Sequence, residues 1–265
     1  MPETPQAPRT QRDRRDRVVT SAIALFLVAP LLLLVPRALA DVWRAPALAP
    51  QAWGLRGVRE AFRPGQQILE ALGNSLSVAI AVTIVAVLLA WPAARTLARL
   101  HGSTRALVFV ALVAPLLVPA YATGIGLTPL LLRLGVADHL LGIVLAHLLY
   151  VLPYVTLALL PAMGADLDAM QEAARVSGAS RLQSWWHVAL PTARGTVATA
   201  MLLGFLVSWA QVGTSLAVGG GLPMLPVAAL PFVRSDPQIA ATMNLVLLAA
   251  PLAALAVTVR LRRLR

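Results

Sequence analysis

The sequence contains no cysteine and no lysine, and few of its residues are charged. Without cysteine, the chain cannot form a disulfide, a thiolate metal site, an iron–sulfur cluster or a cysteine nucleophile. Without lysine, it has no Walker A phosphate loop, no Schiff-base catalyst and no pyridoxal-phosphate site. Only 12% of the 265 residues are charged, against about 25% in soluble globular proteins. The chain therefore lacks the charge needed to cover a water-facing surface.

Apolar residues are in excess, at 58% of the chain. Six windows contain no acidic or basic residue and are long enough to cross a bilayer, which takes about 20 helical residues. The second half of the fifth window is rich in glycine and proline, so we expect that span to end near Ala217, before an irregular external segment. The sequence thus predicts an all-α transmembrane bundle of six spans. The windows are Val18–Pro36, Ala71–Ala94, Ala106–Leu132, Leu140–Ala165, Gly195–Val233 and Pro237–Val259.

The 22 basic residues are all arginines, and their positions predict an orientation. With the N-terminus inside, fifteen arginines fall in internal segments and seven in external ones. This bias follows the positive-inside rule, so we expect both termini to be cytoplasmic. The basic balance is then topological, and it indicates no nucleic-acid partner.

The order of charged and apolar segments predicts the domain organisation. The run Ala38-Leu39-Ala40 resembles a signal-peptidase site, but the preceding apolar run is longer than a typical signal sequence, which argues against cleavage. We expect a basic disordered cytoplasmic tail (1–17), a first span (18–36), an external connection (37–70), a core transmembrane domain (71–259) that includes a cytoplasmic loop (166–194), and a basic cytoplasmic tail (260–265).

Ionisable residues inside spans usually mark ion or proton sites, and here His147 is the one candidate. We interpret it as a neutral histidine bonded to a neighbouring helix. No carboxylate lies inside a span, which disfavours a proton-coupled carrier and an enzyme with paired acids. The four histidines have no metal-ligand spacing. The sequence therefore predicts no catalytic residue and no metal site.

The predicted cytoplasmic loop Asp166–Arg194 is patterned as two short helices. The first is expected near Asp166–Val176, because acidic residues at its start favour a helix N-terminus. Gly178 follows directly and is expected to break this helix. The loop therefore begins with a short, exposed helix.

The second half of the loop begins at Ser180, which with Gln183 fits a capping box. We expect the helix that follows to end at Pro191. It carries Trp185 and Trp186, which indicate docking to a soluble partner. Alternatively, the two tryptophans belong to an interfacial hairpin in the aromatic belt of the membrane.

Taken together, the spacing in this loop resembles the EAA loop of ABC-type import permeases. The family has isoleucine more often where Val188 stands. The resemblance extends over roughly Ala71–Val259, and the segment Ser208-Trp209-Ala210-Gln211 is similar to the thiamine, iron(III), polyamine and sulfate importers. The residues that carry the loop motif are Glu172, Ala173, Ala174, Gly178, Val188, Leu190 and Pro191.

The resemblance implies the type I ABC importer permease fold and a subunit that forms the translocation pathway of an ATP-driven importer in the bacterial inner membrane. It implies that the loop couples this pathway to a separate cytoplasmic ATPase dimer, so that the chain is no enzyme and ATP is bound by the partner. The other implied partners are a second permease, identical or different, an extracytoplasmic substrate-binding protein and membrane lipid. The transported substrate stays open.

Three polar residues of the fifth span lie at positions i, i+3 and i+7, on one face of a continuous helix. They are Ser208, Gln211 and Ser215. They either line the substrate pathway or form hydrogen bonds between helices.

Two other classes of membrane protein compete with the importer permease. An ATP-independent secondary carrier or channel predicts inverted repeats and ionisable or broken-helix sites in the membrane. The sequence shows no obvious repeat and no buried carboxylate. A membrane enzyme would need a nucleophile with a base, or a metal constellation, and neither is apparent.

Overall fold

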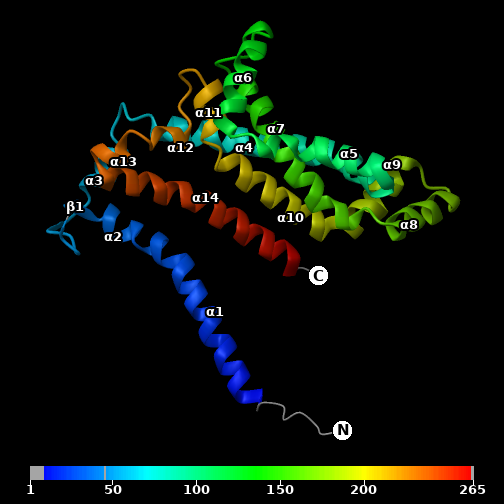
Figure 1. Cartoon of the computed structure of the whole chain (residues 1–265), viewed down its shortest axis with the longest axis horizontal. Coiled ribbons are helices and arrows are strands. Elements are labelled where there is room, and N and C mark those ends of the chain that lie inside the picture. Colours follow the sequence, from blue (N-terminus) through cyan, green and yellow to red (C-terminus); the bar gives the residue numbers. More distant parts are fainter. Residues whose placement is uncertain (1–8, 45, 264–265) are drawn as a thin grey trace. The chain divides into compact units, whose positions relative to one another are not determined.

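The computed structural model describes residues 9–44 and 46–263, and the side chains of residues 14–44 and 46–260. The chain divides into two compact units, and Figure 1 labels the helices and strands of both. The first comprises Met1–Gln66 and Pro231–Leu245, and the second comprises Gln67–Leu230 and Val246–Arg265. In the described residues, five helices are long and apolar enough to cross a membrane, or six if one bent pair counts as a single span. The predicted membrane-spanning helical fold is confirmed.

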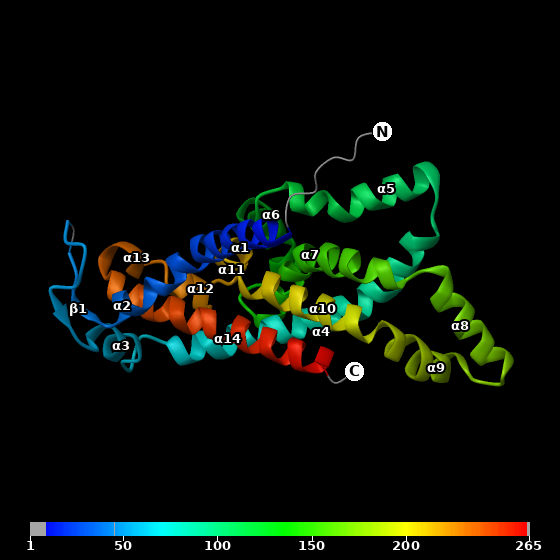
Figure 2. The ribbon, with the colours of Figure 1, turned by 90° about the horizontal axis from the view of Figure 1, so that it is seen from below.

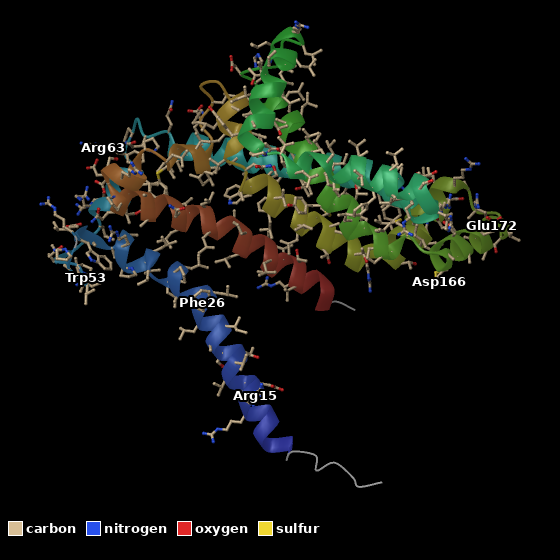
Figure 3. All side chains as sticks on the ribbon, in the orientation of Figure 1. Arg15, Phe26, Trp53, Arg63, Asp166 and Glu172 are labelled. Atoms are coloured by element: carbon tan, nitrogen blue, oxygen red, sulfur yellow. The ribbon has the colours of Figure 1, made fainter. Side chains whose placement is uncertain are left out.

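The first unit contains helices and one small hairpin. Helix α1 begins at Arg9, within the segment predicted to be a disordered tail, and residues 1–8 lie outside the described residues. Phe26 on α1 is 78% exposed (Figure 3). The elements are α1 (Arg9–Leu32), α2 (Leu34–Ala38), β1 (Ala40–Val42), β2 (Ala52–Trp53), α3 (Arg56–Ala61), α13 (Phe232–Ser235) and the start of α14 (Pro237–Arg263).

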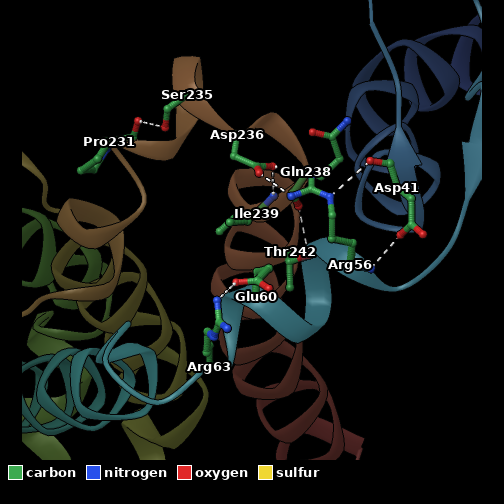
Figure 4. A network of polar contacts seen from close by, with 10 residues as sticks. All are labelled: Asp41, Arg56, Glu60, Arg63, Pro231, Ser235, Asp236, Gln238, Ile239 and Thr242. Carbon is green, nitrogen blue, oxygen red and sulfur yellow. Dashed lines mark hydrogen bonds and ion pairs between the residues drawn. The ribbon is translucent and has the colours of Figure 1, made fainter.

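A network of polar contacts closes this unit (Figure 4). The backbone N–H of Arg56 donates to Asp41 Oδ1 at 2.8 Å. The Arg56 guanidinium binds both oxygens of Asp236, at 2.6 and 3.1 Å. Hydrogen bonding from Arg56 holds the pKa of the Asp236 carboxyl below its ordinary value. This fork-like pair fastens α3 to the residue that precedes α14, with geometry typical of strong arginine–carboxylate pairs.

The core of the second unit is formed by α4 (Ile68–Arg99), α7 (Leu140–Leu159) and α10 (Leu190–Trp209), which lie side by side (Figure 2). Helix α4 buries a small or β-branched residue at every fourth position from Val82 to Ala94. A Cβ at Gly204 of α10 would come within 2.9 Å of Val155 on α7. Small residues let helix backbones approach closely, which drives packing within a membrane.

The third predicted span, Ala106–Leu132, is not one straight helix. It consists of α5 (Gly102–Val113), η1 (Ala114–Leu117) and α6 (Ala120–Arg133), and the two apolar parts meet at an angle of 99°. The predicted third span is therefore bent, and it counts as one span only if its two parts are taken together.

The bend falls at Val118 and Pro119, for a local reason. Val118 is extended, with φ −103° and ψ 134°, as the residue before a proline prefers to be. Its carbonyl has left the helical ladder, and the Tyr150 hydroxyl of α7 donates to it at 2.8 Å. A tertiary hydrogen bond thus satisfies a carbonyl that a broken helix would leave unpaired.

Beyond the bend, α6 packs against the short helix α11 (Gly213–Val218), and glycines on both helices allow the contact. A Cβ at Gly124 would lie 2.6 Å from Ala217, and one at Gly213 would lie 2.7 Å from the Tyr121 nitrogen. The remaining elements of the unit are η2 (Leu160–Ala162), α8 (Ala165–Val176), α9 (Arg181–Ser184), the π-helical turn η3 (Trp185–Ala189) and α12 (Leu225–Ala228).

Candidate functional site

The loop between α7 and α10 begins with α8, whose bounds agree with the predicted helix. Leu167 and Gln171 form its buried side, whereas Glu172 and Ala173 are exposed. Figure 3 shows Asp166 and Glu172 along this helix. The Glu172 carboxylate pairs with Arg175 one turn later. Helix α8 therefore has one packed face and one free face.

The turn after α8 is a Schellman motif centred on Gly178. Gly178 has φ +94°, in the left-handed region that favours glycine. Its N–H bonds to the Arg175 carbonyl at 3.0 Å, and the Ala179 N–H bonds to the Ala174 carbonyl at 3.0 Å. These are the two bonds that define the motif. The prediction that Gly178 ends the first helix is confirmed.

The predicted capping box is present at the start of α9. Ser180 Oγ accepts from the Gln183 N–H at 3.2 Å, and Gln183 Oε1 accepts from the Ser180 N–H at 2.8 Å. Each residue satisfies an amide that would otherwise have no partner at the helix N-terminus.

The second loop helix does not end at Pro191, so that expectation is wrong. The helix runs from Arg181 to Trp209 without interruption. A π-helical turn, Trp185–Ala189, precedes the proline, and within it the Leu190 N–H bonds to the Trp185 carbonyl, five residues back. A proline ring collides with the carbonyl four residues before it in a regular α-helix. The wider turn accommodates Pro191 inside the helix.

Ion pairs hold the loop against α4. Asp168 Oδ1 on α8 lies 2.5 Å from Arg95 Nη2 and 2.8 Å from Arg99 Nη2, both in the last turns of α4. Burial alone would raise the pKa of Asp168, but the hydrogen bonds from the two arginines outweigh it and lower the pKa. The position of α8 is therefore coupled to the end of a membrane-spanning helix.

Aromatic rings make a second contact between α4 and the loop. Trp91 and Trp185 meet edge to face, with centroids 5.6 Å apart, and Trp185 and Trp186 meet at 4.9 Å. Trp186 is 54% exposed, whereas Trp185 is half-buried. Of the two tryptophans, Trp185 anchors the loop to α4, whereas Trp186 packs on Trp185 and is largely exposed.

His147 lies in the core of the second unit and is fully buried. Its Nδ1 is 2.9 Å from Ser208 Oγ, and its Nε2 is 2.9 Å from Ser215 Oγ. The interpretation of His147 as a residue bonded to a neighbouring helix is confirmed. The sequence shows a histidine in one span and two serines in another, but it does not indicate that these three side chains contact one another.

The fifth span was expected to continue to Ala217, and this expectation is wrong. Helix α10 ends at Trp209, and α11 begins at Gly213. Ser208, Gln211 and Ser215 therefore do not share one face of a regular helix. Ser208 and Ser215 are brought together by His147, and the Ser215 hydroxyl also lies 2.8 Å from the Gln211 carbonyl. The histidine thus bridges the interruption between helices α10 and α11.

A further pair of polar contacts, which the sequence did not predict, involves the start of α4. Asn74 Nδ2 donates to the Pro223 carbonyl at 3.0 Å, and Ser75 Oγ accepts from the Leu225 N–H at 2.9 Å. The segment before α12 is thereby held to α4. Among the described residues, no group of three or more acidic residues, histidines or cysteines could hold a metal ion.

Comparison with known proteins identifies relatives of one kind. No protein-family model matches the chain. The chain is 30% identical over 238 residues to the putrescine transport system permease protein PotI of Escherichia coli, which covers 84% of this chain and 82% of PotI. It is 33% identical over 159 residues to the osmoprotective compounds uptake permease protein GgtD of Synechocystis sp., which covers 60% of this chain and 53% of GgtD. The chain thus spans about half the length of GgtD.

The fold also has a solved counterpart. The crystal structure of a bacterial ABC transporter involved in the import of the acidic polysaccharide alginate matches 97% of this chain and 99% of its own, with a TM-score of 0.70 and 15% identity. At this identity the match establishes the fold alone. Together with the similarity to PotI, it leads to one conclusion: the chain belongs to the ABC transporter permeases, the multi-pass inner-membrane subunits of ABC importers.

Proposed function

We propose that this chain works as one of two permeases around a central pathway. A separate cytoplasmic ATPase dimer binds and hydrolyses the ATP that drives transport. An extracytoplasmic binding protein delivers the substrate. The names of PotI and GgtD, both transport permeases, support this role. The absence of lysine supports a separate ATPase, because a Walker A loop needs one. On this proposal the chain has no catalytic residue and no cofactor of its own.

The observation that carries the proposal is the α8 loop, with a free face on one side and ion pairs to α4 on the other. We assign the docking surface to Glu172, Ala173 and Ala174, whose short alanine side chains permit close approach of an ATPase groove. Gly178 sets the turn behind this surface. Movement of a docked ATPase would then move α8 and, through Asp168, the end of α4.

The junction of the loop with α10 is the second part of the coupling element. Val188, Leu190 and Pro191 lie in or directly after the π-helical turn. Because the helix continues from Arg181 to Trp209, a displacement of the loop would pass into α10 without a flexible linker. We propose that these three residues fix the angle at which the loop joins the span.

The loop and both termini are proposed to lie on the cytoplasmic side. The arginine distribution supports this orientation, with fifteen of 22 in the segments assigned to the inside. The segment that contains the hairpin of the first unit would then face the outside.

For the translocation pathway, we propose that Gln211 borders it, at the break between α10 and α11. The Gln211 side chain is partly exposed, and unwound backbone within a span is tolerated where it lines a cavity. Ser208 and Ser215 have a different part in this proposal: bonded to His147, they hold the break in shape. The relatives' names cover osmoprotective compounds and putrescine, so no single substrate is assigned.

The natural absence of cysteine permits a direct test. Ala173→Cys places one thiol on the free face of α8, and Leu48→Cys, at a residue that is 97% exposed, places one in the predicted external segment. A membrane-impermeant maleimide should label Cys at position 173 in inverted vesicles and Cys at position 48 in right-side-out vesicles. The reverse pattern would show that the proposed orientation is wrong.

The same variants test coupling. With the cognate ATPase carrying single cysteines in its groove, position 173 should form a crosslink and position 48 should not. If position 173 is accessible from the cytoplasm, yet no ATPase co-purifies and flux in vesicles needs no ATP, the alternative of a secondary carrier replaces the proposal.

A further inference from the structure

A cavity lined by four arginines lies between the end of α4 and the loop. Its volume is about 360 Å³, and its lining includes Arg95, Arg99, Arg175, Arg181, Gln171 and Trp185. The guanidinium groups come from three elements, because α4 supplies two and α8 and α9 supply one each. The fold therefore gathers positive charge that the sequence distributes over more than 80 positions.

The positive charge in this cavity exceeds the negative charge paired with it. Asp168 is shared by Arg95 and Arg99, and Arg175 pairs with Glu172. Arg181 forms no ion pair with any residue whose side chain the structure describes. The cavity thus has four guanidinium groups but only two paired carboxylates, which bind three of the four. The imbalance favours an anionic ligand that brings several acceptor oxygens.

A buried polar group in the cavity wall also lacks a partner. Gln171 is only 6% exposed, and its Oε1 has no hydrogen-bond partner among the described side chains and backbone. Buried polar atoms without partners are rare in native proteins, and such an atom indicates a place where a water or a ligand binds. Because the two ends of a glutamine amide can exchange by rotation, Gln171 can turn its NH₂ group toward an acceptor oxygen.

The tryptophans indicate the depth of the cavity in the membrane. Trp185 lines it and contacts Trp91 of α4. Tryptophan rings gather at the level of the lipid headgroups. Arg95 follows Trp91 by one helical turn, about 6 Å along the axis. By this argument Arg95 would lie near the headgroup phosphates of the adjacent leaflet, and basic pockets at this level recognise acidic headgroups.

We propose that this cavity binds a phosphate group, carried in the membrane by the headgroup of an anionic phospholipid. Planar guanidinium groups match the oxygens of phosphate in pairs. A bound phosphate would bridge Arg95 or Arg99 on α4 to Arg181 on α9, and would add a lipid-dependent contact to the ion pairs of Asp168. The inference rests on the cavity and on the tryptophans beside it, and it stands whether or not α8 docks an ATPase.

The test measures binding to the full chain, purified in a neutral detergent, by isothermal titration calorimetry. The probes are dioctanoyl-phosphatidylglycerol, dioctanoyl-phosphatidylcholine and inorganic phosphate. We expect the glycerol lipid to bind at least about tenfold more tightly than the choline lipid, whose ammonium group the arginines repel. Arg181→Gln should weaken its binding about tenfold, the effect of losing a charge-assisted hydrogen bond. Arg181→Lys should recover only part of the affinity, because lysine keeps the positive charge but lacks the planar fork of donors.

Arg105→Gln is the matched control, since Arg105 on α5 is exposed and does not line the cavity. It should leave the affinity for phosphatidylglycerol unchanged. Binding of inorganic phosphate as well would show that the phosphate group itself suffices, and binding of the lipid alone would make the membrane the source. Both outcomes support the proposal. Thermal unfolding of each variant separates loss of binding from loss of folding.

Three outcomes would overturn the proposal. The first is equal binding of the two lipids. The second is equal weakening by Arg181→Gln and Arg105→Gln. The third is no binding of any phosphate probe to the folded chain. If the Arg181→Gln variant then also loses a co-purifying ATPase, the cavity receives an acidic side chain of a protein partner instead of a headgroup.

Discussion

The carboxylate of Asp168 lies 2.5 Å from the guanidinium of Arg95 and so joins the loop helix α8 to the end of α4. The two residues are separated by 73 positions in the chain. Asp168 also binds Arg99, which makes it the point where the loop and a membrane-spanning helix share one carboxylate.

Asp168→Asn should reduce ATP-driven uptake while the protein still inserts and folds. The loss of free energy of unfolding should be at most about 1 kcal/mol, because solvent screens partly exposed ion pairs. The loss of uptake should be larger, from a few-fold to about 30-fold, the range for residues that carry coupling between sites. Glu60→Gln, which breaks the exposed Glu60–Arg63 pair of the first unit, is the control. Equal uptake by both variants would exclude a coupling role for Asp168.

The same contact should depend on pH in acid. The pKa of Asp168 is lowered from its ordinary value of 3.8. A carboxyl whose pKa is lower in the folded state stabilises the fold above its unfolded pKa, and this stabilisation is lost as the pH falls through the folded pKa. The difference in melting temperature between wild type and Asp168→Asn should be constant from pH 7 to about pH 5. The difference in melting temperature should become smaller as the pH falls below 3.8, the ordinary pKa of the carboxyl. A difference that grows in acid would contradict the assignment.

Gly178→Val should abolish uptake, because valine is strained at φ +94° and the Schellman turn would open. Gly65 provides a matched control, since it has φ +101°, has no atom within 4 Å of the position that a Cβ would take, and lies outside the loop. Both substitutions should cost about 1–3 kcal/mol of backbone strain. Only Gly178→Val should lose uptake in vesicles. If both variants transport normally, the turn has no part in coupling.

His147→Ala should destabilise the protein strongly, because it leaves a cavity and two buried hydroxyls without their shared partner. The expected loss is about 2–4 kcal/mol, combining the cavity and the lost hydrogen bonds. Thermal unfolding in detergent measures it. His139→Ala changes an exposed histidine just before α7 and should have little effect. An unchanged melting temperature for His147→Ala would mean that the bridge to Ser208 and Ser215 contributes nothing.

Features that depend on neighbouring residues could be predicted from the sequence. The charge-free windows located the spans, because a bilayer imposes a length and excludes charge on any sequence. The bounds of α8, the glycine turn at Gly178 and the capping box at Ser180 and Gln183 also followed from local patterns. In each case the deciding hydrogen bonds join residues at most five positions apart.

Features decided by distant residues could not be predicted. Pro119 bends its span by 99°, whereas Pro191 lies inside a continuous helix, and the two prolines look alike in sequence. The bend is supported by Tyr150, 32 residues away, and the continuous helix by a π-helical turn. In the candidate site, the pairing of His147 with Ser208 and Ser215 likewise spans more than 60 positions. The order of residues alone carries no signal for such contacts.

The uninterrupted helix from Arg181 to Trp209 has a mechanical consequence. Its 29 residues correspond to a rod of about 43 Å at 1.5 Å per residue. A tilt of about 5° at the loop end of a rod of this length displaces the other end by roughly 4 Å. That end is Trp209, where the helix is interrupted before α11 and His147 bridges the interruption. A small rotation of the helix at the loop end would thus move its other end by more than the length of a hydrogen bond. The displacement would fall on the segment between α10 and α11, where the backbone is already unwound.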